Sequence, residues 1–75
     1  MTNNVVEGYY DEGARKIVEI DQHVRFNNGI SIIEGQIWQI SQESFYSHTR
    51  TILIKGNDGK IHRISSKDLG GVELL

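Results

Sequence analysis

From residue 16 onward, apolar and polar residues alternate over several short segments, which is the pattern of half-buried β-strands. Gln22 interrupts the first apolar face, so we expect a short strand over 16–20 and a second strand that begins near His23. A reversal is expected at Asn27-Asn28-Gly29, because Asn and Gly tolerate the positive φ angles of tight turns. The apolar residues of these two strands all fall on even positions, namely Val18, Ile20, Val24 and Phe26.

The next predicted strand covers residues 30–41, and its apolar residues do not keep one parity. Ile33 and Ile37 are odd, whereas the other four, Ile30, Ile32, Trp38 and Ile40, are even. Gly35 lies at the change, and a Gly inside a strand is typical of a bulge or of a bend where another backbone comes close. The polar residues that follow, 41–49, are expected to form a loop.

A second hairpin is predicted around Gly56-Asn57-Asp58-Gly59, because Asp-Gly between two strand-like segments is a strong hairpin signal. The pattern leaves its register open. A three-residue loop with a Gly bulge pairs Ile52 with Ile64, whereas a four-residue loop pairs Ile54 with Ile61. The choice between them decides which side chains of the hairpin lie opposite one another.

After this hairpin the chain has room for one helical turn and one more strand. Ser65, followed three residues later by Asp68, resembles a capping box. Gly70 and Gly71 limit the helix to a single 3₁₀ turn, and residues 72–74 can form a closing strand. No segment repeats apolar residues at helical spacing for three turns. The predicted fold class is therefore all-β.

This order of elements resembles an SH3-like barrel, a five-stranded small barrel with one short 3₁₀ turn before its last strand. An OB-like five-stranded barrel uses nearly the same turns and stays open as the alternative. We expect the barrel to cover residues 16–75. Residues 1–15 are expected to form a flexible acidic N-terminal tail, because Gly8 and Gly13 interrupt any apolar period there.

The local resemblance is to the KOW-type version of this barrel. Asp21-Gln22-His23-Val24-Arg25-Phe26 is similar to the acid-x-x-apolar-x-apolar opening of that motif. Gly29 and then Glu34-Gly35-Gln36-Ile37-Trp38-Gln39-Ile40 resemble its glycine-punctuated second strand. The stretch is also similar to short Gram-positive bacterial and phage proteins that form small barrels. Between the glycines this chain has Ile30-Ser31-Ile32-Ile33 rather than basic residues, so the resemblance implies a fold and not RNA contact.

Composition narrows the possible function classes. The chain has 75 residues, no cysteine and a net charge of −2. All eight basic residues lie within 14–75 together with seven acidic ones, so the predicted barrel lacks the positive field of a bulk nucleic-acid coat protein. No apolar run is long enough to span a bilayer, and the first residues do not resemble a secretion signal. We therefore predict a cytoplasmic protein without a membrane partner.

Catalytic and metal chemistry have no supporting pattern in this sequence. His23, His48 and His62 lie in different predicted elements, at no spacing typical of metal ligands. The sequence contains no nucleophile elbow, P-loop or zinc-protease motif, and a barrel this small leaves no sizeable internal pocket. We predict a non-enzymatic protein with no cofactor and no metal site.

The first functional hypothesis is a protein-interaction adaptor or regulator. Its binding surface comprises Trp38 with Phe45 and Tyr46 of the predicted loop, because large aromatic side chains dominate interface energetics. Trp38 can equally well fill the core, whereas Phe26 is assigned to the core because its parity matches the other core residues. An unidentified protein is the predicted partner.

The second hypothesis is a nucleic-acid-binding accessory protein. It uses the cations of the 50–63 hairpin, Arg50, Lys55, Lys60 and Arg63, to contact phosphates. The same cations can instead protect an edge strand against aggregation. The predicted assembly is a monomer or a weak homodimer formed through an exposed edge strand.

Overall fold

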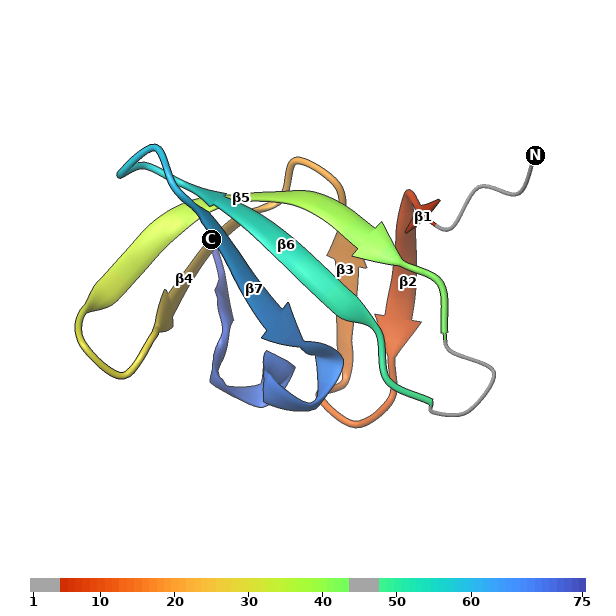
Figure 1. The fold of residues 1–75 in the computed structure, drawn as a ribbon. Coiled ribbons are helices and arrows are strands. Elements are labelled where there is room, and N and C mark those ends of the chain that lie inside the picture. Colours follow the sequence, from red (N-terminus) through yellow and green to blue (C-terminus); the bar gives the residue numbers. More distant parts are fainter. Residues whose placement is uncertain (1–4, 44–47) are drawn as a thin grey trace.

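Strands dominate the computed structural model, which describes residues 5–43 and 48–75 (Figure 1). Two short N-terminal strands, β1 and β2, precede the segment where alternation begins. The only helix in the described residues is the 3₁₀ helix η1, which lies just before the last strand. The elements are β1 (Val5–Val6), β2 (Gly8–Asp11), β3 (Lys16–Glu19), β4 (His23–Asn27), β5 (Ile32–Ser41), β6 (Thr51–Gly56), β7 (Ile61–Ser65), η1 (Ser66–Gly71) and β8 (Glu73–Leu74).

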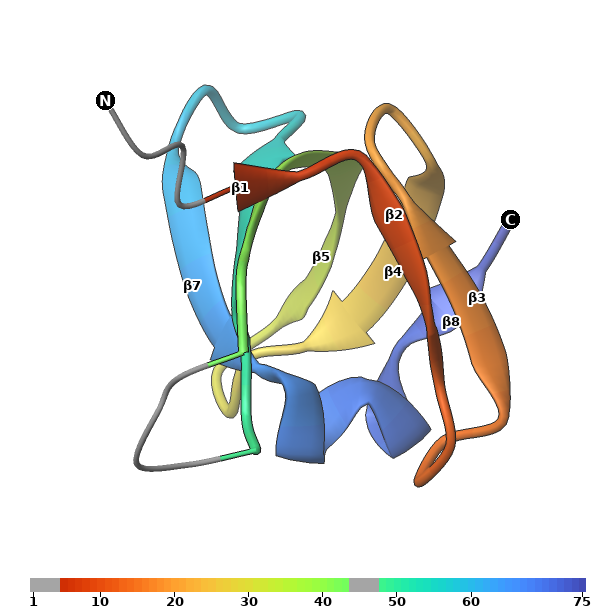
Figure 2. The ribbon, with the colours of Figure 1, turned by 90° about the vertical axis from the view of Figure 1, so that its right-hand side faces the viewer.

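Two antiparallel sheets contain these strands. The main sheet has the order β7-β6-β5-β4-β8, with β1 paired to the end of β5, and β2 pairs with β3 as a separate two-stranded sheet. Figure 2 shows the β2–β3 hairpin standing beside the main sheet, across the interior from β7. The all-β prediction is confirmed. The main sheet has two ends, at β7 and β8, and among the described strands these ends do not pair with each other.

The register of the β6–β7 hairpin follows the three-residue loop, because Ile52 lies opposite Ile64. The Gly56 N–H donates to the Lys60 carbonyl at 2.8 Å, and Gly59 has a φ of +82°, a left-handed conformation that favours glycine. Asp58 completes the turn by accepting the Lys60 N–H at 2.9 Å. The alternative four-residue loop is wrong.

The parity change in β5 has its origin at Trp38 rather than at Gly35. The β5–β6 register is regular up to Ile37 opposite Ile54 and then shifts by one residue, so Trp38 is the extra residue of a bulge. Gly35 instead lies where another backbone comes close, since a Cβ there would lie 2.2 Å from the Lys55 carbonyl oxygen. The bulge thus lies beyond the glycine at which the sequence pattern placed it.

The core lies between the main sheet, the β2–β3 hairpin and η1. Phe26 is buried there, as its parity predicts, and Leu69 of η1 is completely buried. A 3₁₀ helix is present at the predicted place, and the Ser65 hydroxyl caps it by accepting the Lys67 N–H at 3.2 Å. The predicted limit of a single turn is wrong, because η1 has six residues and continues through Gly70 and Gly71. The buried apolar residues are Val18, Val24, Phe26, Ile33, Ile37, Ile40, Ile52, Ile54, Leu69 and Val72.

Residues 5–11 differ from the predicted tail, because they form strands. Tyr9 of β2 lies opposite the buried Val18 of β3 and packs against the core. The Lys16 ammonium donates to the Leu69 carbonyl at 2.7 Å and also to the Val72 carbonyl. These two bonds satisfy carbonyls at the end of η1 and attach the hairpin to a segment more than fifty residues away in the sequence.

Candidate binding surface

Trp38 lies on the surface, with 47% of its side chain area exposed. Ile37 and Ile40 on either side of the bulge are buried, which directs Trp38 and Gln39 to the opposite face of the sheet. The structure thus decides between the two interpretations of Trp38 in favour of the surface. Phe45 and Tyr46, the other residues of the predicted aromatic surface, lie outside the described residues.

The register of β5, β6 and β7 shows which side chains accompany Trp38. Ile52 and Ile54 are buried, so Leu53 and Lys55 point outward from β6. Ile61 lies opposite Lys55, and Arg63 lies opposite Leu53. We call the surface formed by Trp38, Leu53, Lys55, Ile61 and Arg63 the outer face.

The outer face combines an apolar diagonal with positive charge. The apolar diagonal consists of Trp38 on β5, Leu53 on β6 and Ile61 on β7. Leu53 is half-buried, and Ile61 is 46% exposed. Lys55 and Arg63 occupy the positions beside this diagonal, and Gln36, Gln39 and Thr51 at its margin are uncharged. Such a surface favours partners that present apolar and acidic groups together.

The acidic side chains next to the outer face already have partners. Glu34 lies 3.5 Å from the Arg25 guanidinium. Asp58 lies 3.1 Å from His62 and accepts the Lys60 N–H. These contacts lower the pKa of Asp58, with the Lys60 backbone hydrogen bond as the largest cause, and so keep its carboxylate ionised. The positive charge of the outer face is therefore not neutralised by a direct ion pair to either carboxylate.

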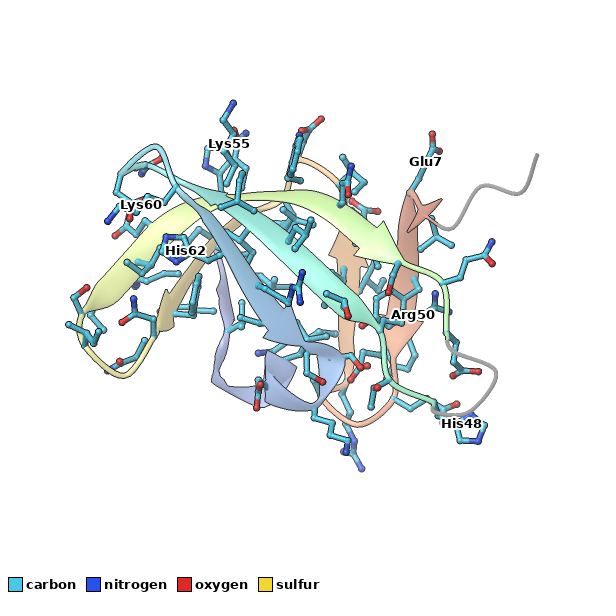
Figure 3. The ribbon with its side chains drawn as sticks, viewed as in Figure 1. Glu7, His48, Arg50, Lys55, Lys60 and His62 are labelled. Atoms are coloured by element: carbon cyan, nitrogen blue, oxygen red, sulfur yellow. The ribbon has the colours of Figure 1, made fainter. Side chains whose placement is uncertain are left out.

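The four cations of the predicted nucleic-acid site are not brought together. Lys55 and Lys60 lie near the turn of the β6–β7 hairpin, whereas Arg50 lies at the other end of β6 (Figure 3). The Arg50 guanidinium stacks on the Tyr9 ring at 4.4 Å from its centroid and donates to the Ser41 carbonyl at 3.1 Å. Arg50 therefore joins the N-terminal hairpin to the main sheet, and Arg63 stays with the outer face.

Tyr9 is the residue of the N-terminal hairpin on which Arg50 stacks. Burial, followed by the nearby Asp11 carboxylate, raises its pKa from 10.0 to about 12. The Tyr9 hydroxyl donates to Asp11 at 3.4 Å, which favours the neutral phenol in the same way. The sequence contains only a weak signal for this role, since Tyr9 and Tyr10 are adjacent aromatic residues of the kind enriched in strands. That signal is too short to distinguish a strand from a tail.

Leu53 and Ile61 are the residues of the outer face that sequence reasoning missed as surface groups. The run Ile52-Leu53-Ile54 suggests burial on both faces of the strand, and the structure buries only the two isoleucines fully. Strict alternation along β6 is the signal that identifies Leu53 as outward-facing.

Neither a metal-binding cluster nor a membrane-spanning helix is found in the described residues. Among residues 5–43 and 48–75, no three His, Asp or Glu side chains form a group able to hold a metal ion. The described part of the chain has no helix with the length and apolar character needed to cross a bilayer. No protein-family model matches the chain, and no curated protein or solved structure is significantly similar to it.

Proposed function

We propose that this chain is a non-enzymatic binding module of SH3-like type, and that it recognises a protein partner through the outer face. The SH3-like assignment is supported by the order β8-β4-β5-β6-β7 and by a 3₁₀ helix between the last two strands. The partner presents an acidic and apolar surface, because Lys55 and Arg63 border the apolar diagonal of the outer face.

The exposed Trp38 is the observation that supports this proposal most strongly. A small domain needs large apolar side chains in its core, yet this sole Trp is placed at a bulge that directs it outward. Trp is among the residues most enriched at interface hot spots, where truncation costs about 2 kcal/mol or more of binding free energy. With Leu53 and Ile61 on the same face, Trp38 belongs to an apolar diagonal rather than being a single exposed apolar residue.

The test compares partner capture by matched variants. The immobilised protein, Trp38→Ala and Ile61→Ala are exposed to an extract of the source cells, and bound proteins are quantified by mass spectrometry. Ile32→Ala is the control, because Ile32 is 59% exposed and lies beyond the end of β6. A specific partner is reduced about tenfold or more by the first two changes and is retained by the control. Equal capture of the partner by the unchanged protein, Trp38→Ala and Ile61→Ala contradicts the proposal.

A nucleic-acid partner is the second candidate, and the observation that favours it is the placement of an aromatic ring and two cations on one face. Trp38 can stack on a base while Lys55 and Arg63 contact phosphates, an arrangement typical of single-strand binding surfaces. A titration of ¹⁵N-labelled protein with short single- and double-stranded oligonucleotides at low and moderate salt tests this candidate. Shifts at the outer face that fade with salt and with Arg63→Glu support it, and a salt-insensitive complex excludes it.

A further inference from the structure

The outer edge of β7 presents backbone groups that no described strand satisfies. Two hydrogen bonds bracket the β6–β7 ladder, from the Gly56 N–H to the Lys60 carbonyl and from the Ser66 N–H to the Arg50 carbonyl, both at 2.8 Å. Hydrogen-bonded and non-bonded pairs alternate in an antiparallel ladder. The N–H and C=O groups of the odd-numbered residues therefore point away from β6, and these residues are Ile61, Arg63 and Ser65.

β7 is also an end of the main sheet, and Figure 2 shows no other strand on the side of β7 that faces away from β6. This arrangement is the template for strand addition, in which an extended segment forms backbone hydrogen bonds with an exposed edge. The length of the edge, five residues, suits a short peptide segment.

A groove of about 610 Å³ runs beside this edge, between β7, the end of β4 and η1. Its apolar lining includes Phe26, Ile64 and Val72. The Phe26 ring meets the His62 ring edge-on, with centroids 5.9 Å apart, at one end of the apolar part. A strand added to β7 would place every second side chain beside Ile64, toward this groove, because side chains alternate along a strand.

The charges beside the edge of β7 indicate which kind of chain segment can pair with it. Arg63 and Lys67 line the groove against a single carboxylate, Asp68, and Lys60 lies immediately before β7. Full antiparallel pairing of β7 with β7 of a second copy would set Arg63 opposite Arg63, and like charges placed opposite each other are destabilising. This arrangement disfavours a second copy and favours an acidic partner.

We infer that the free edge of β7 binds an extended segment of a partner protein in which apolar and acidic residues alternate. The apolar residues lie in the groove beside Ile64, and the acidic residues lie beside Arg63. The two surfaces share Arg63, but edge recognition depends on the backbone of β7, whereas the proposed function depends on the Trp38 and Ile61 side chains. The two surfaces adjoin each other and can be tested separately.

The experiment measures amide hydrogen exchange in ¹⁵N-labelled protein with a capped ten-residue peptide of alternating Val and Glu. In the free protein, His62 and Ile64 amides exchange slowly and Ile61, Arg63 and Ser65 amides exchange fast. At ~1 mM peptide, a concentration that detects even weak binding, the three edge amides gain protection of about tenfold or more. A peptide N-methylated at alternate residues, which lacks the required donors, gives no such protection.

Charge variants complete the test. Replacing Glu by Lys in the peptide, or Lys67→Glu in the protein, weakens binding by about fivefold or more, since each change replaces attraction by repulsion. Lys55→Glu, a cation of the outer face that does not line the groove, leaves binding within about threefold. Trp38→Ala leaves it unchanged, so failure of the outer-face proposal is distinguishable from failure here.

Three results would overturn this inference. The first is fast exchange of all three edge amides with the peptide present. The second is equal protection by the N-methylated peptide, which would show that backbone pairing is not the mode of binding. The third is concentration-dependent protection of these amides in protein without peptide, which would identify a second copy of the chain as the occupant.

Discussion

The two hairpins of this protein, β6–β7 and β2–β3, are built on different physical principles. The β6–β7 turn is specified by its own residues, since Gly59 supplies the left-handed conformation and Asp58 accepts the Lys60 N–H. The β2–β3 hairpin has a charged turn in which Arg15 adopts a φ of +56°, a conformation uncommon for a residue with a side chain. The β6–β7 turn is therefore determined by its own residues, whereas the conformation of β2–β3 depends on its contacts with the rest of the chain.

Beyond the packing of Val18 and Tyr9 on the core, a few polar contacts attach β2–β3 to the rest of the chain. Lys16 binds two carbonyls at the end of η1, and Arg50 stacks on Tyr9. The Asp21 N–H donates to the Ile37 carbonyl of β5 at 2.7 Å just after β3 ends. The β6–β7 hairpin instead continues the main sheet through a full ladder with β5. Substitutions in the two regions should therefore differ in whether they unfold the whole protein or release only one hairpin.

The largest effect is expected at the junction of β5 and β6. Gly35→Ala places a Cβ 2.2 Å from the Lys55 carbonyl oxygen and 2.7 Å from the Gly56 Cα, which forces two backbones apart. We expect a loss of about 3 kcal/mol or more in the free energy of unfolding, measured by urea denaturation. Gly70→Ala is the control, because no atom lies within 4 Å of the position that its Cβ would take, and it should change stability by less than about 0.5 kcal/mol.

Lys16→Met should produce the next largest effect and should be local. It leaves the Leu69 and Val72 carbonyls without their ammonium donor, which costs about 1–3 kcal/mol. Hydrogen exchange should accelerate in β2 and β3 first and leave the β6–β7 ladder protected. Lys67→Met, at an exposed cation of η1, serves as the control. Uniform acceleration across the main sheet would contradict the distinction between the two hairpins.

Gly59→Ala tests the local character of the β6–β7 turn. A residue with a Cβ at a φ of +82° costs about 1–2 kcal/mol, and nothing within 4 Å would clash with it. The loss should appear as a lower denaturation midpoint with an unchanged Ile52–Ile64 register, checked by cross-strand nuclear Overhauser effects. A changed register would show that the turn alone selects the pairing.

The smallest effect, absent at neutral pH, concerns Tyr9. Burial and Asp11 raise the Tyr9 pKa to about 12, so the folded state retains a proton that the unfolded state loses near the ordinary tyrosine pKa of 10.0. The stability contributed by neutral Tyr9 is present below pH 10 and is lost as pH rises through 12. Denaturation at stepwise pH should show a decline over this window that Tyr9→Phe lacks. Equal declines in both proteins would contradict the assignment.

Much of the main sheet was predictable because its signals are short-range. Alternation identified β4, and Asp58-Gly59 between two strand-like segments identified the β6–β7 hairpin. Ser65 identified the start of η1. The sequence left open which face of the sheet Trp38 occupies, because a bulge changes the parity of the buried positions without requiring a characteristic residue type. The candidate site was predictable only as a set of residue types, because Leu53, Ile61 and Trp38 become neighbours through register.

Local sequence is sufficient for the all-β class, the β6–β7 turn and the capped 3₁₀ helix, because each depends on φ preferences and hydrogen bonds within a few residues. Three other features required the folded chain: residues 5–11 form strands, Trp38 faces outward, and Arg50 lies apart from Lys55 and Lys60. Those outcomes depend on contacts between residues tens of positions apart. Such contacts gain free energy only once the intervening chain has folded, so no local pattern encodes them.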